Sequence, residues 1–544
     1  MDDPADARRT GSVFTRPWLA DTVLDIAGYS ATKPLWEMKA LEPSCGDGVF
    51  LRSMIDRLLA TLTANDLTLD VAEDAIRAFD IDPRAVDASL RLVVDALVGW
   101  GAPASTAHEL ATTWVRHADF LEVADDVSGF DVAVGNPPYV RYDRIEEVKA
   151  RRYQERWLTM TARADLYVGF IEASLASLKG GGRLTMICAD RWMRNGYGRR
   201  LRGLVASTYD LELVATIHDS DAFERRVQAY PAVVSIRRAE PGDALFIELD
   251  DFGPTEAKQL VEDVEAARVG RSDRRPGQFA SVRSATLGDG HWPSGPPEVM
   301  RRMEVVKHAW APLVDHDGVV TGVGLATGAD AVFLTKDPEG FEDSQLVPVV
   351  SARDLRGGAT TPSRWLVSPW AADGSLIALA DYPSVGAHLE EHRTALAGRY
   401  VAQRDPTRWW RTIDKLRPGL LTSPKLVFPD LSVSIEPHLD RGTAYPLHSV
   451  YWLTSSTWDL EVLGGLLLSP YASDALKAHS VRMGSGRMRV TTQYLRQLRL
   501  PARAALSTKF QDELRQAFRQ RSRHASAAVV DRLIANVSPA PGLP

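Results

Sequence analysis

Residues 130–139 read FDVAVGNPPY: an apolar, strand-like run leads directly into Asn136, two prolines and Tyr139. The two prolines fix the backbone and remove two N–H donors, so the carbonyl oxygens beside Asn136 become acceptors in a rigid loop. Asn136 adds a side-chain carbonyl oxygen, and Tyr139 adds a flat aromatic face. The segment therefore suits a planar group that carries an amino function.

The first 240 or so residues alternate apolar strand-like runs with amphipathic helical runs. This alternation is typical of an α/β domain with a mostly parallel sheet. Helices are predicted over residues 49–62, where apolar residues recur every four positions, and over 167–178. Strands are expected at Met38–Glu42, Ile76–Ile81, Thr113–Ala118, Phe130–Gly135, Arg183–Ala189, Leu213–His218 and Tyr230–Arg237, the last of which could run antiparallel to its neighbours.

A glycine turn follows the first expected strand. The sequence LEPSCGDGVFL at residues 41–51 places Gly46 and Gly48 between this strand and the next helix. Glycines allow the backbone to approach a ligand closely, and the start of the helix offers unpaired N–H groups. The turn lacks the full G-x-G-x-x-G pattern of dinucleotide enzymes, so NAD is the weaker choice of ligand.

Acidic residues mark the ends of the next two expected strands. Asp80 lies in FDIDP at residues 79–83, and Asp119 precedes Phe120 in ADFL. Because open α/β sheets bind ligands beyond the carboxyl ends of their strands, these residues are expected to lie in one site. Asp80 suits a ribose diol, and Asp119 with Phe120 suits an adenine ring. Asp82, before Pro83, is the better candidate for capping the following helix.

The Asn-Pro-Pro-Tyr segment offers a solution to one chemical problem. An aromatic amine is a poor nucleophile, because its lone pair is delocalised into the ring. The side-chain oxygen of Asn136 and the carbonyl oxygen of Pro137 can hold both N–H groups and favour a pyramidal nitrogen, which then attacks a methyl group on a sulfonium. Positioning and electrostatics carry such a step without a covalent intermediate.

Five motifs in a fixed order resemble those of the class I S-adenosylmethionine-dependent DNA adenine-N6 methyltransferases. Within that family they are similar to the TaqI-type group, which carries a C-terminal target recognition domain. The likeness covers essentially the whole chain and runs through GSVFTRPWLAD at 11–21, LEPSCGDGVFL at 41–51, FDIDP at 79–83, ADFL at 118–121 and GNPPY at 135–139. It implies a Rossmann-like α/β methyltransferase sheet followed by a mixed α/β recognition domain. The implied reaction methylates N6 of an adenine flipped out of duplex DNA.

The resemblance also implies roles for single residues. Asn136 and Pro137 would hold the target amine, Tyr139 would stack on the flipped base, and Tyr197 is the candidate for its other face. The residues implied to bind S-adenosylmethionine are Thr15, Glu42, Ser44, Cys45, Gly46, Gly48, Asp80, Ile81, Asp119 and Phe120. In this chain Arg16 separates Thr15 from the proline, whereas the family commonly reads Thr-Pro.

The expected organisation has four parts. A methyltransferase catalytic domain is expected at 1–245, a connecting segment with a Gly- and Pro-rich linker at 246–298, a DNA-binding recognition domain at 299–505, and a basic helical tail at 506–544. Looser likenesses to the recognition domain of the group lie at residues 318–334, 353–357, 409–410 and 425–430.

Charge gives two different signals. The chain has 64 Lys and Arg against 71 Asp and Glu, a formal net charge of −7, which excludes a general polycation. Residues 477–523 nevertheless carry 12 basic residues against 2 acidic ones. Arg482, Arg487 and Arg489 surround a Gly-Ser loop and are the expected DNA contacts. Beyond Arg503, a solvated basic helix is the more usual explanation.

Composition excludes several other classes. Cys45 and Cys188 are too few for a disulfide framework or a thiolate zinc site, so reduced core thiols and no metal are expected. The polar N-terminus and the absence of an apolar run of about 18 residues predict a cytoplasmic protein without a membrane partner. Double-stranded DNA is the expected partner, with a separate cognate restriction endonuclease as a further candidate.

Three alternative functions stay open at this point. The first is a protein glutamine-N5 or RNA methyltransferase, which uses the same Asn-Pro-Pro-Tyr chemistry. The second is a DNA-binding module without activity. The third is a fused restriction–modification enzyme, which we do not expect because the methyltransferase motifs begin at Gly11 and Glu37-Met38-Lys39 lies on the first expected strand.

Overall fold

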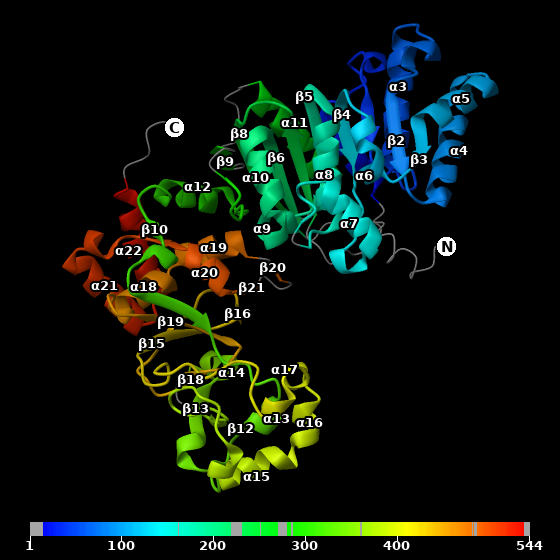
Figure 1. The fold of residues 1–544 in the computed structure, drawn as a ribbon. Coiled ribbons are helices and arrows are strands. Elements are labelled where there is room, and N and C mark those ends of the chain that lie inside the picture. The colour runs from blue at the N-terminus through cyan, green and yellow to red at the C-terminus, as the bar shows by residue number, and fades with distance from the viewer. Residues whose placement is uncertain are drawn as a thin grey trace. The chain divides into compact units, whose positions relative to one another are not determined.

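The computed structural model divides into two compact units, residues 1–300 and 301–544 (Figure 1). Helix α12 (Pro297–Val306) contains the point of division. Among the residues that the structure describes, no helix combines the length and the apolar character needed to cross a bilayer. The structure describes residues 15–161, 163–218, 231–250, 252–269, 280–283, 287–358, 362–480, 482–483 and 487–537.

The first unit is built on a nine-stranded sheet, in the order β3-β2-β1-β4-β5-β7-β6-β8-β9. Its pairs are parallel except where β7 joins β5 and β6, and where β9 joins β8. This confirms the expected Rossmann-like sheet and its antiparallel strand at 231–237. The strands are β1 (Ala40–Glu42), β2 (Ile76–Asp80), β3 (Val115–His117), β4 (Phe130–Gly135), β5 (Leu178–Ala189), β6 (Asp210–His218), β7 (Pro231–Arg237), β8 (Asp243–Asp250) and β9 (Ala280–Arg283).

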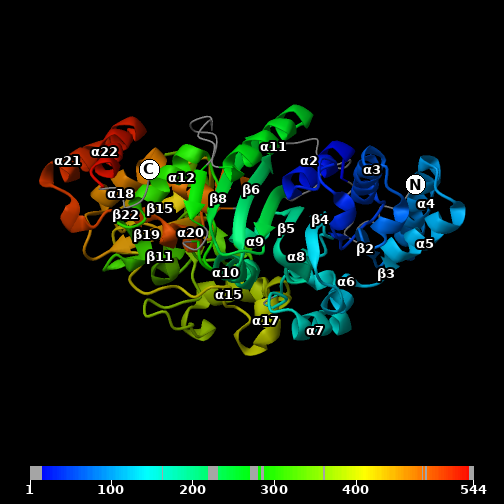
Figure 2. The ribbon, with the colours of Figure 1, turned by 90° about the horizontal axis from the view of Figure 1, so that it is seen from above.

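Helices cover both faces of this sheet, and each face has its own apolar core. Figure 2 shows α2, α3 and α11 on one side of the central strands, with α8 and α10 on the other. Strands buried on both faces must be apolar throughout, which explains their unbroken hydrophobic runs. The helices are α2 (Pro17–Ala27), α3 (Val49–Ala64), α4 (Pro83–Trp100), α5 (Ala104–Trp114) and α11 (Pro254–Arg268) on one face, and α6 (Phe120–Val123), α7 (Glu147–Arg156), α8 (Leu166–Ser177), α9 (Arg191–Arg194) and α10 (Arg199–Thr208) on the other.

The segment 246–298, expected from the sequence to connect two domains, contributes the end of β8 and the whole of β9 to this sheet. Residue 245 lies inside β8, which pairs with β6 over six residues, and β9 follows after α11. The compact unit therefore extends to Met300. The physical reason is that β6 would otherwise be an exposed edge strand of the sheet, and β8 satisfies its backbone hydrogen bonds.

The second unit is mixed α/β, as expected. Its strands form sheets in the orders β11-β19-β15-β17, β12-β14-β13-β18, β16-β21-β20 and β10-β22. The strands are β10 (Ala311–Pro312), β11 (Val319–Val323), β12 (Leu334–Thr335), β13 (Leu346–Val350), β14 (Arg364–Val367), β15 (Lys425–Pro429), β16 (Leu431–Ser432), β17 (His438–Asp440), β18 (Tyr445–Pro446), β19 (Val450–Ser455), β20 (Arg482–Met483), β21 (Arg487–Arg489) and β22 (Arg499–Leu500).

Two apolar cores stabilise the second unit, one mainly under its C-terminal helices and one under α13 to α17. The C-terminal segment, for which a basic helical tail is predicted, contains the helices α21 and α22. The helices are α13 (Asp330–Phe333), α14 (Ala352–Arg356), α15 (Pro383–Glu391), α16 (Arg393–Ala397), α17 (Tyr400–Arg404), α18 (Leu460–Leu468), α19 (Pro470–His479), α20 (Thr492–Gln497), α21 (Thr508–Arg519) and α22 (Arg523–Ala535).

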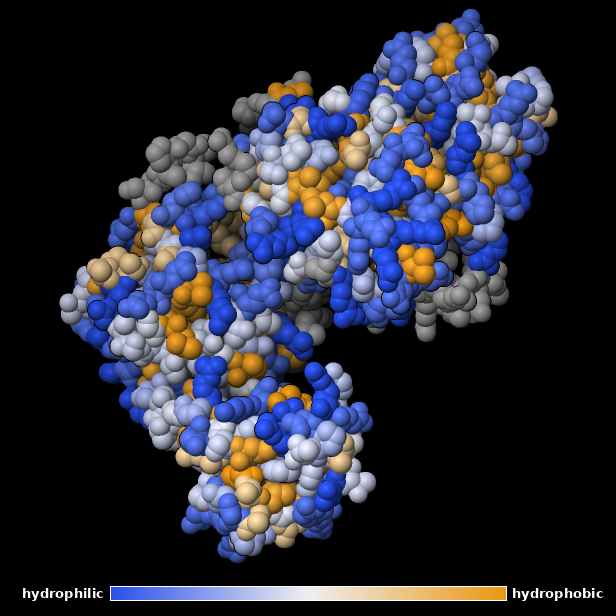
Figure 3. All heavy atoms as spheres, in the orientation of Figure 1, coloured by the Kyte–Doolittle hydropathy of each residue, from blue (hydrophilic) through white to orange (hydrophobic). Residues whose placement is uncertain are grey.

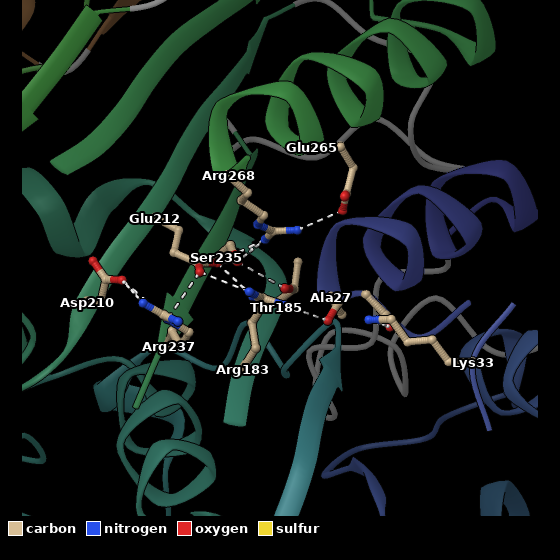
Figure 4. Close-up of polar contacts among 11 residues, drawn as sticks. Ala27, Lys33, Arg183, Thr185, Asp210, Glu212, Ser235, Arg237, Glu265 and Arg268 are labelled. Carbon is tan, nitrogen blue, oxygen red and sulfur yellow. Dashed lines mark hydrogen bonds and ion pairs between the residues drawn. The ribbon is translucent and has the colours of Figure 1, made fainter. Parts of the chain in front are cut away.

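A half-buried carboxylate joins the sheet of the first unit to the helices on one face. Glu212 on β6 accepts hydrogen bonds from Arg183 at 2.7 and 3.0 Å, from Arg268 of α11 at 2.9 Å and from Ser235 at 3.1 Å (Figure 4). Arg183 also donates to the carbonyl oxygen of Ala27, at the end of α2, at 3.1 Å. One carboxylate therefore helps to hold both α2 and α11 on the sheet.

We predict that Glu212→Gln lowers the free energy of unfolding by about 3–5 kcal/mol, because it leaves partly buried guanidinium groups without their counter-charge. Burial opposes ionisation, but the hydrogen bonds and charges of Arg183 and Arg268 outweigh it and lower the pKa of Glu212 to about 2. The ionised group therefore stabilises the fold fully above its ordinary pKa of 4.5, and this contribution is lost as the pH falls from there towards 2.

Urea titration measures the change in the free energy of unfolding. Hydrogen–deuterium exchange in β6 and α11 then shows whether the loss of stability is located there. The matched control is Glu265→Gln, which removes an exposed partner of Arg268 and should cost less than about 1 kcal/mol. Equal effects of the two substitutions, or a difference that does not shrink in acid, would contradict the prediction.

Candidate functional site

A cavity of about 510 Å³ opens at the carboxyl ends of the parallel strands in the first unit. Most residues predicted to bind a cofactor line it, as does Asn136, while Gly48, Pro137, Tyr139 and Tyr197 do not. The predicted residues that the cavity brings together are Thr15, Glu42, Ser44, Cys45, Gly46, Asp80, Ile81, Asp119, Phe120 and Asn136.

Backbone geometry explains the two glycines of the turn. Gly46 has φ +52°, and a Cβ there would meet no atom within 4 Å, in keeping with its place on the cavity wall. Gly48 has φ +84° and precedes α3, and a Cβ there would lie 3.0 Å from Leu92 Cδ1 and 3.4 Å from Ser89 Oγ. Gly46 therefore leaves space for a ligand, whereas Gly48 serves the turn and its packing.

Asp80 holds this turn in place. Its Oδ2 accepts from the Gly46 N–H at 2.9 Å, and its Oδ1 accepts from the Asp82 N–H at 2.9 Å. Burial raises the pKa of Asp80 even though these hydrogen bonds lower it. Asp82 caps α4 by accepting from the Arg84 N–H at 2.9 Å, as predicted.

Glu42 is a buried carboxylate at the end of β1, with 1% of its surface exposed. Burial first, and then the nearby carboxylates of Asp47 and Asp80, hold the pKa of Glu42 well above its ordinary value. Within the described residues, its Oε2 has no hydrogen-bond partner. Because an isolated buried carboxylate is costly, this end of the cavity suits a cationic ligand.

Asp119 contacts helix α7, which carries none of the sequence motifs. Its Oδ1 accepts from the Leu121 N–H at 3.2 Å and caps α6, while Tyr153 of α7 donates to Oδ2 at 2.6 Å. Lys149 Nζ, also of α7, lies 3.7 Å from Oδ2. Phe120 is buried beside them and lines the cavity. Lys149 and Tyr153 were missed because α7 reads from sequence as a charged surface helix.

Asn136 directly follows β4, and its side chain reaches the N-terminal segment. Its Nδ2 donates to Thr15 Oγ1 at 3.0 Å, and its backbone carbonyl oxygen accepts from Ser44 Oγ at 3.4 Å. Since Nδ2 is turned towards Thr15, Oδ1 lies on the opposite branch of the amide. Arg16 therefore does not keep Thr15 away from the site, although it interrupts the usual Thr-Pro pair.

Tyr139 and Tyr197 are the two predicted base-stacking residues, and each of them contacts Tyr167. The Tyr139 ring centroid is 6.1 Å from that of Tyr167, edge to face, and the Tyr167 and Tyr197 hydroxyl oxygens are 3.0 Å apart. Tyr197 donates to Asp165 Oδ2 at 3.1 Å, and Tyr139 donates to the Ile187 carbonyl oxygen at 3.4 Å. Asp165 and Tyr167 were missed, although ADLY at the start of a helix was a usable signal.

The predicted DNA-contacting arginines lie in the second unit. Arg489 is exposed on β21, which pairs with β20 and β16. The backbones of Arg482 and Arg487 belong to the same small sheet, but their side chains, like residues 484–486 between them, lie outside the described part of the chain.

Comparison with known proteins is consistent with this architecture. The profile of the Eco57I restriction-modification methylase family matches residues 75–223. The Type II methyltransferase M.PaeR7I of Pseudomonas aeruginosa is 35% identical over 528 residues, which cover 96% of this chain and 91% of the relative. M.XhoI of Xanthomonas vasicola, another Type II methyltransferase, is 33% identical over 516 residues, with 93% and 94% covered.

A solved structure supports the fold. The Type IIL restriction-modification enzyme MmeI, in complex with DNA, superposes with a TM-score of 0.56 at 11% sequence identity, over 96% of this chain and 74% of that one. At this identity the likeness concerns the fold alone. Sequence identity above 30% over nearly the full length of both chains is decisive by itself. The protein therefore belongs to the restriction-modification methylase family of Type II methyltransferases.

Proposed function

We propose that this methyltransferase transfers a methyl group from S-adenosylmethionine to N6 of an adenine flipped out of duplex DNA, as the modification enzyme of a restriction–modification system. The observation that carries the proposal is the place of Asn136, on the wall of a cavity that also contains the buried carboxylate of Glu42. The similarity to Type II methyltransferases and to a DNA-bound restriction-modification enzyme supports DNA as the substrate.

The residues of the cavity fit S-adenosylmethionine. A volume of about 510 Å³ is in the usual range for small-ligand sites, roughly 300–1,000 Å³. The unpartnered Oε2 of Glu42 suits the ammonium group, Asp80 suits the ribose hydroxyls, and Asp119 with Phe120 suits the adenine ring. When bound, S-adenosylmethionine supplies an electrophilic methyl group on a sulfonium.

The loop after β4 prepares the amine. Oδ1 of Asn136 and the carbonyl oxygen of Pro137 each accept one N–H of the target amino group, so the nitrogen lone pair is directed away from the ring. Thr15 fixes the orientation of the Asn136 amide through the bond to Nδ2. Such positioned acceptors act without reorganising during the reaction, and a rigid loop holds them in place for it.

Tyr139 and Tyr197 hold the flipped base. Extrusion of a nucleotide from a duplex costs a few kcal/mol, and stacking in the protein offsets part of that cost. The hydroxyl of Tyr139 is anchored on β5, while its ring remains partly exposed. Tyr197 is held by Asp165 and Tyr167, so it is preorganised as the second wall.

The main prediction concerns the modified base. Expression in a methylation-free bacterial host, followed by single-molecule sequencing of the host DNA, should show N6-methyladenine at one short sequence. Asn136→Ala should remove this signal and slow methyl transfer by at least about 100-fold, because the amine then has one acceptor instead of two. Methylated cytosine, methylation confined to RNA or a protein glutamine, or full activity of the variant would contradict the proposal.

The raised pKa of Glu42 predicts that cofactor binding releases a proton. A cation beside the carboxylate favours its ionised form, so the pKa falls on binding and Glu42 loses a proton at any pH between its pKa values without and with the cofactor. Glu42→Gln should abolish this release and weaken binding about 30-fold or more. Calorimetry in two buffers of different ionisation enthalpy measures both, with Glu146→Gln at the exposed rim of the cavity as the control. Proton release that persists in Glu42→Gln would contradict this role.

A third prediction separates base capture from cofactor binding. Tyr139→Ala and Tyr197→Ala should reduce the fluorescence rise of a duplex with 2-aminopurine at the target, while cofactor affinity changes less than threefold, about 0.7 kcal/mol. Tyr167→Phe, which removes one hydroxyl group and keeps both outer rings, is the matched control and should show an intermediate effect. Equal losses of base capture and cofactor affinity would show that the tyrosines support the cavity instead.

A further inference from the structure

Many basic residues of the C-terminal segment contact other residues of the second unit. Seven of its arginines form ion pairs or donate to carbonyl and hydroxyl oxygens, and several of them tie α21 and α22 to the sheet and to α18. The contacts are Arg499 with the Lys307 and Trp310 carbonyls, Arg503 with the Thr457 carbonyl, Arg515 with Asp459 and Asp512, Arg519 with Glu461, Arg521 with the Pro437 carbonyl, Arg523 with Ser473 and Arg532 with Glu513. Among these, Arg515, Arg519 and Arg532 are already paired with carboxylates, whereas Lys509 of α21 has no ion pair within the described residues.

A second basic stretch covers residues 393–417. It includes α16, α17 and the loop that follows, and it holds seven basic residues against two acidic ones in a chain of net charge −7. These are Arg393, Arg399, Arg404, Arg408, Arg411, Lys415 and Arg417, against Asp405 and Asp414.

Two of these cations are exposed with no carboxylate at ion-pairing distance within the described residues, although Lys415, after the hydrogen bonds from Ser375, helps to lower the pKa of the nearby Asp373 carboxyl. In the described part of the chain, neither Arg404 nor Lys415 forms an ion pair, and Arg408 has only Asp405, at 3.8 Å. The Arg404 guanidinium lies 5.8 Å from the ring centroid of Tyr400, which is 72% exposed. This arrangement places positive charge beside an exposed aromatic face.

A hollow of about 670 Å³ continues this surface, with Arg408, Arg411, Lys415, Trp410 and Ile413 on its walls. Arg411 joins the hollow to α17, because it donates to the Val401 carbonyl oxygen at 3.5 Å. Ile413 is 54% exposed. Over α16 and α17 the molecular surface is mainly hydrophilic with a small hydrophobic area (Figure 3).

We propose that these residues form a binding surface for the backbone of double-stranded DNA. The Tyr400 surface, as we name it, consists of Tyr400, Arg404, Arg408, Arg411, Ile413 and Lys415. Its cations bind phosphates, and Tyr400 and Ile413 make apolar contacts with the sugars and base edges between them. The proposal rests on the proposed function, since that function supplies a polyanion as substrate.

Physical chemistry favours a nucleic acid over an acidic protein here. Exposed cations without internal partners gain most from a dense row of phosphates, because binding releases the counterions condensed on DNA. Aromatic and arginine side chains placed together are also the usual groups that contact nucleotides. The tail arginines would have to give up their carboxylates and carbonyls first.

A paired set of variants tests the surface. Arg404→Gln with Lys415→Gln removes two positive charges from it, and Arg515→Gln with Arg519→Gln removes two from α21 in the same unit that are already paired with carboxylates. Affinity for a labelled random-sequence duplex is measured by fluorescence anisotropy over a KCl series. The first pair should reduce the slope of log affinity against log[KCl] by about 1.8, roughly 0.9 for each phosphate that the protein no longer neutralises.

We expect the control pair to leave the slope within about 0.5 of the wild type. Arg404→Lys with Lys415→Arg, which keeps both charges, should restore the slope. Tyr400→Ala should lower affinity without changing the slope. Thermal melts and cofactor titrations of every variant should match the wild type.

The outcomes distinguish this proposal from the proposed function. An unchanged slope in the first pair, an equal drop in the control pair, or competition by polyglutamate but not by DNA would overturn the Tyr400 surface. A reduced slope in a protein that methylates no DNA would leave the surface in place and overturn the catalytic proposal. A wild-type chain that binds no duplex would overturn both.

Discussion

The carboxylate of Asp80 is the constraint on which the candidate site depends. Its two hydrogen bonds, to the N–H groups of Gly46 and Asp82, tie the turn after β1 to the end of β2. Parallel pairing sets the register of these strands, with Glu42 opposite Ala78, so both acidic residues end at the same edge. If the turn moved, the cavity around the buried carboxylate of Glu42 would change shape. The acidic groups therefore support the local fold as well as the ligand that we propose.

The N-terminal segment shows how stability and chemistry are linked at a distance. Thr15, which orients Asn136, lies two residues before α2, and α2 is held at its other end by Arg183. Arg183 is in turn paired with Glu212, as is Arg268 of α11. Segments more than 200 residues apart in sequence thus rely on one carboxylate. Replacement of such a group by an apolar residue would disturb the site through α2, without touching the cavity itself.

Much of the first unit could be predicted from sequence because its signals are local. The glycine turn and the acidic strand ends lie within a few residues of the positions they mark, and the strands follow from unbroken apolar runs. Strand β8 was not recognised, because its pairing with β6 depends on a long-range contact. Tyr153 was missed for a similar reason: nothing in a charged helix indicates that one hydroxyl reaches Asp119. Sequence motifs report the strand ends, whereas the groups that orient them come from packing.

The distribution of charge likewise depends on packing that the sequence does not show. The net charge of −7 is a sum over the whole chain. The effect of each charged residue on binding depends on whether it is buried and whether it has a partner. Glu42 is buried and, within the described residues, its Oε2 has no hydrogen-bond partner, so this part of the cavity suits a cation. Arg519 is exposed yet bound to Glu461, whereas Arg404 and Lys415 have no ion pair within the described residues. A count of charges along the sequence puts the tail first, but it does not separate Arg515 and Arg519, which are paired with carboxylates, from Arg404, which has no ion pair within the described residues. Because binding of a polyanion draws on charge that the fold has not already neutralised, the partners of each cation matter as much as its place in the sequence.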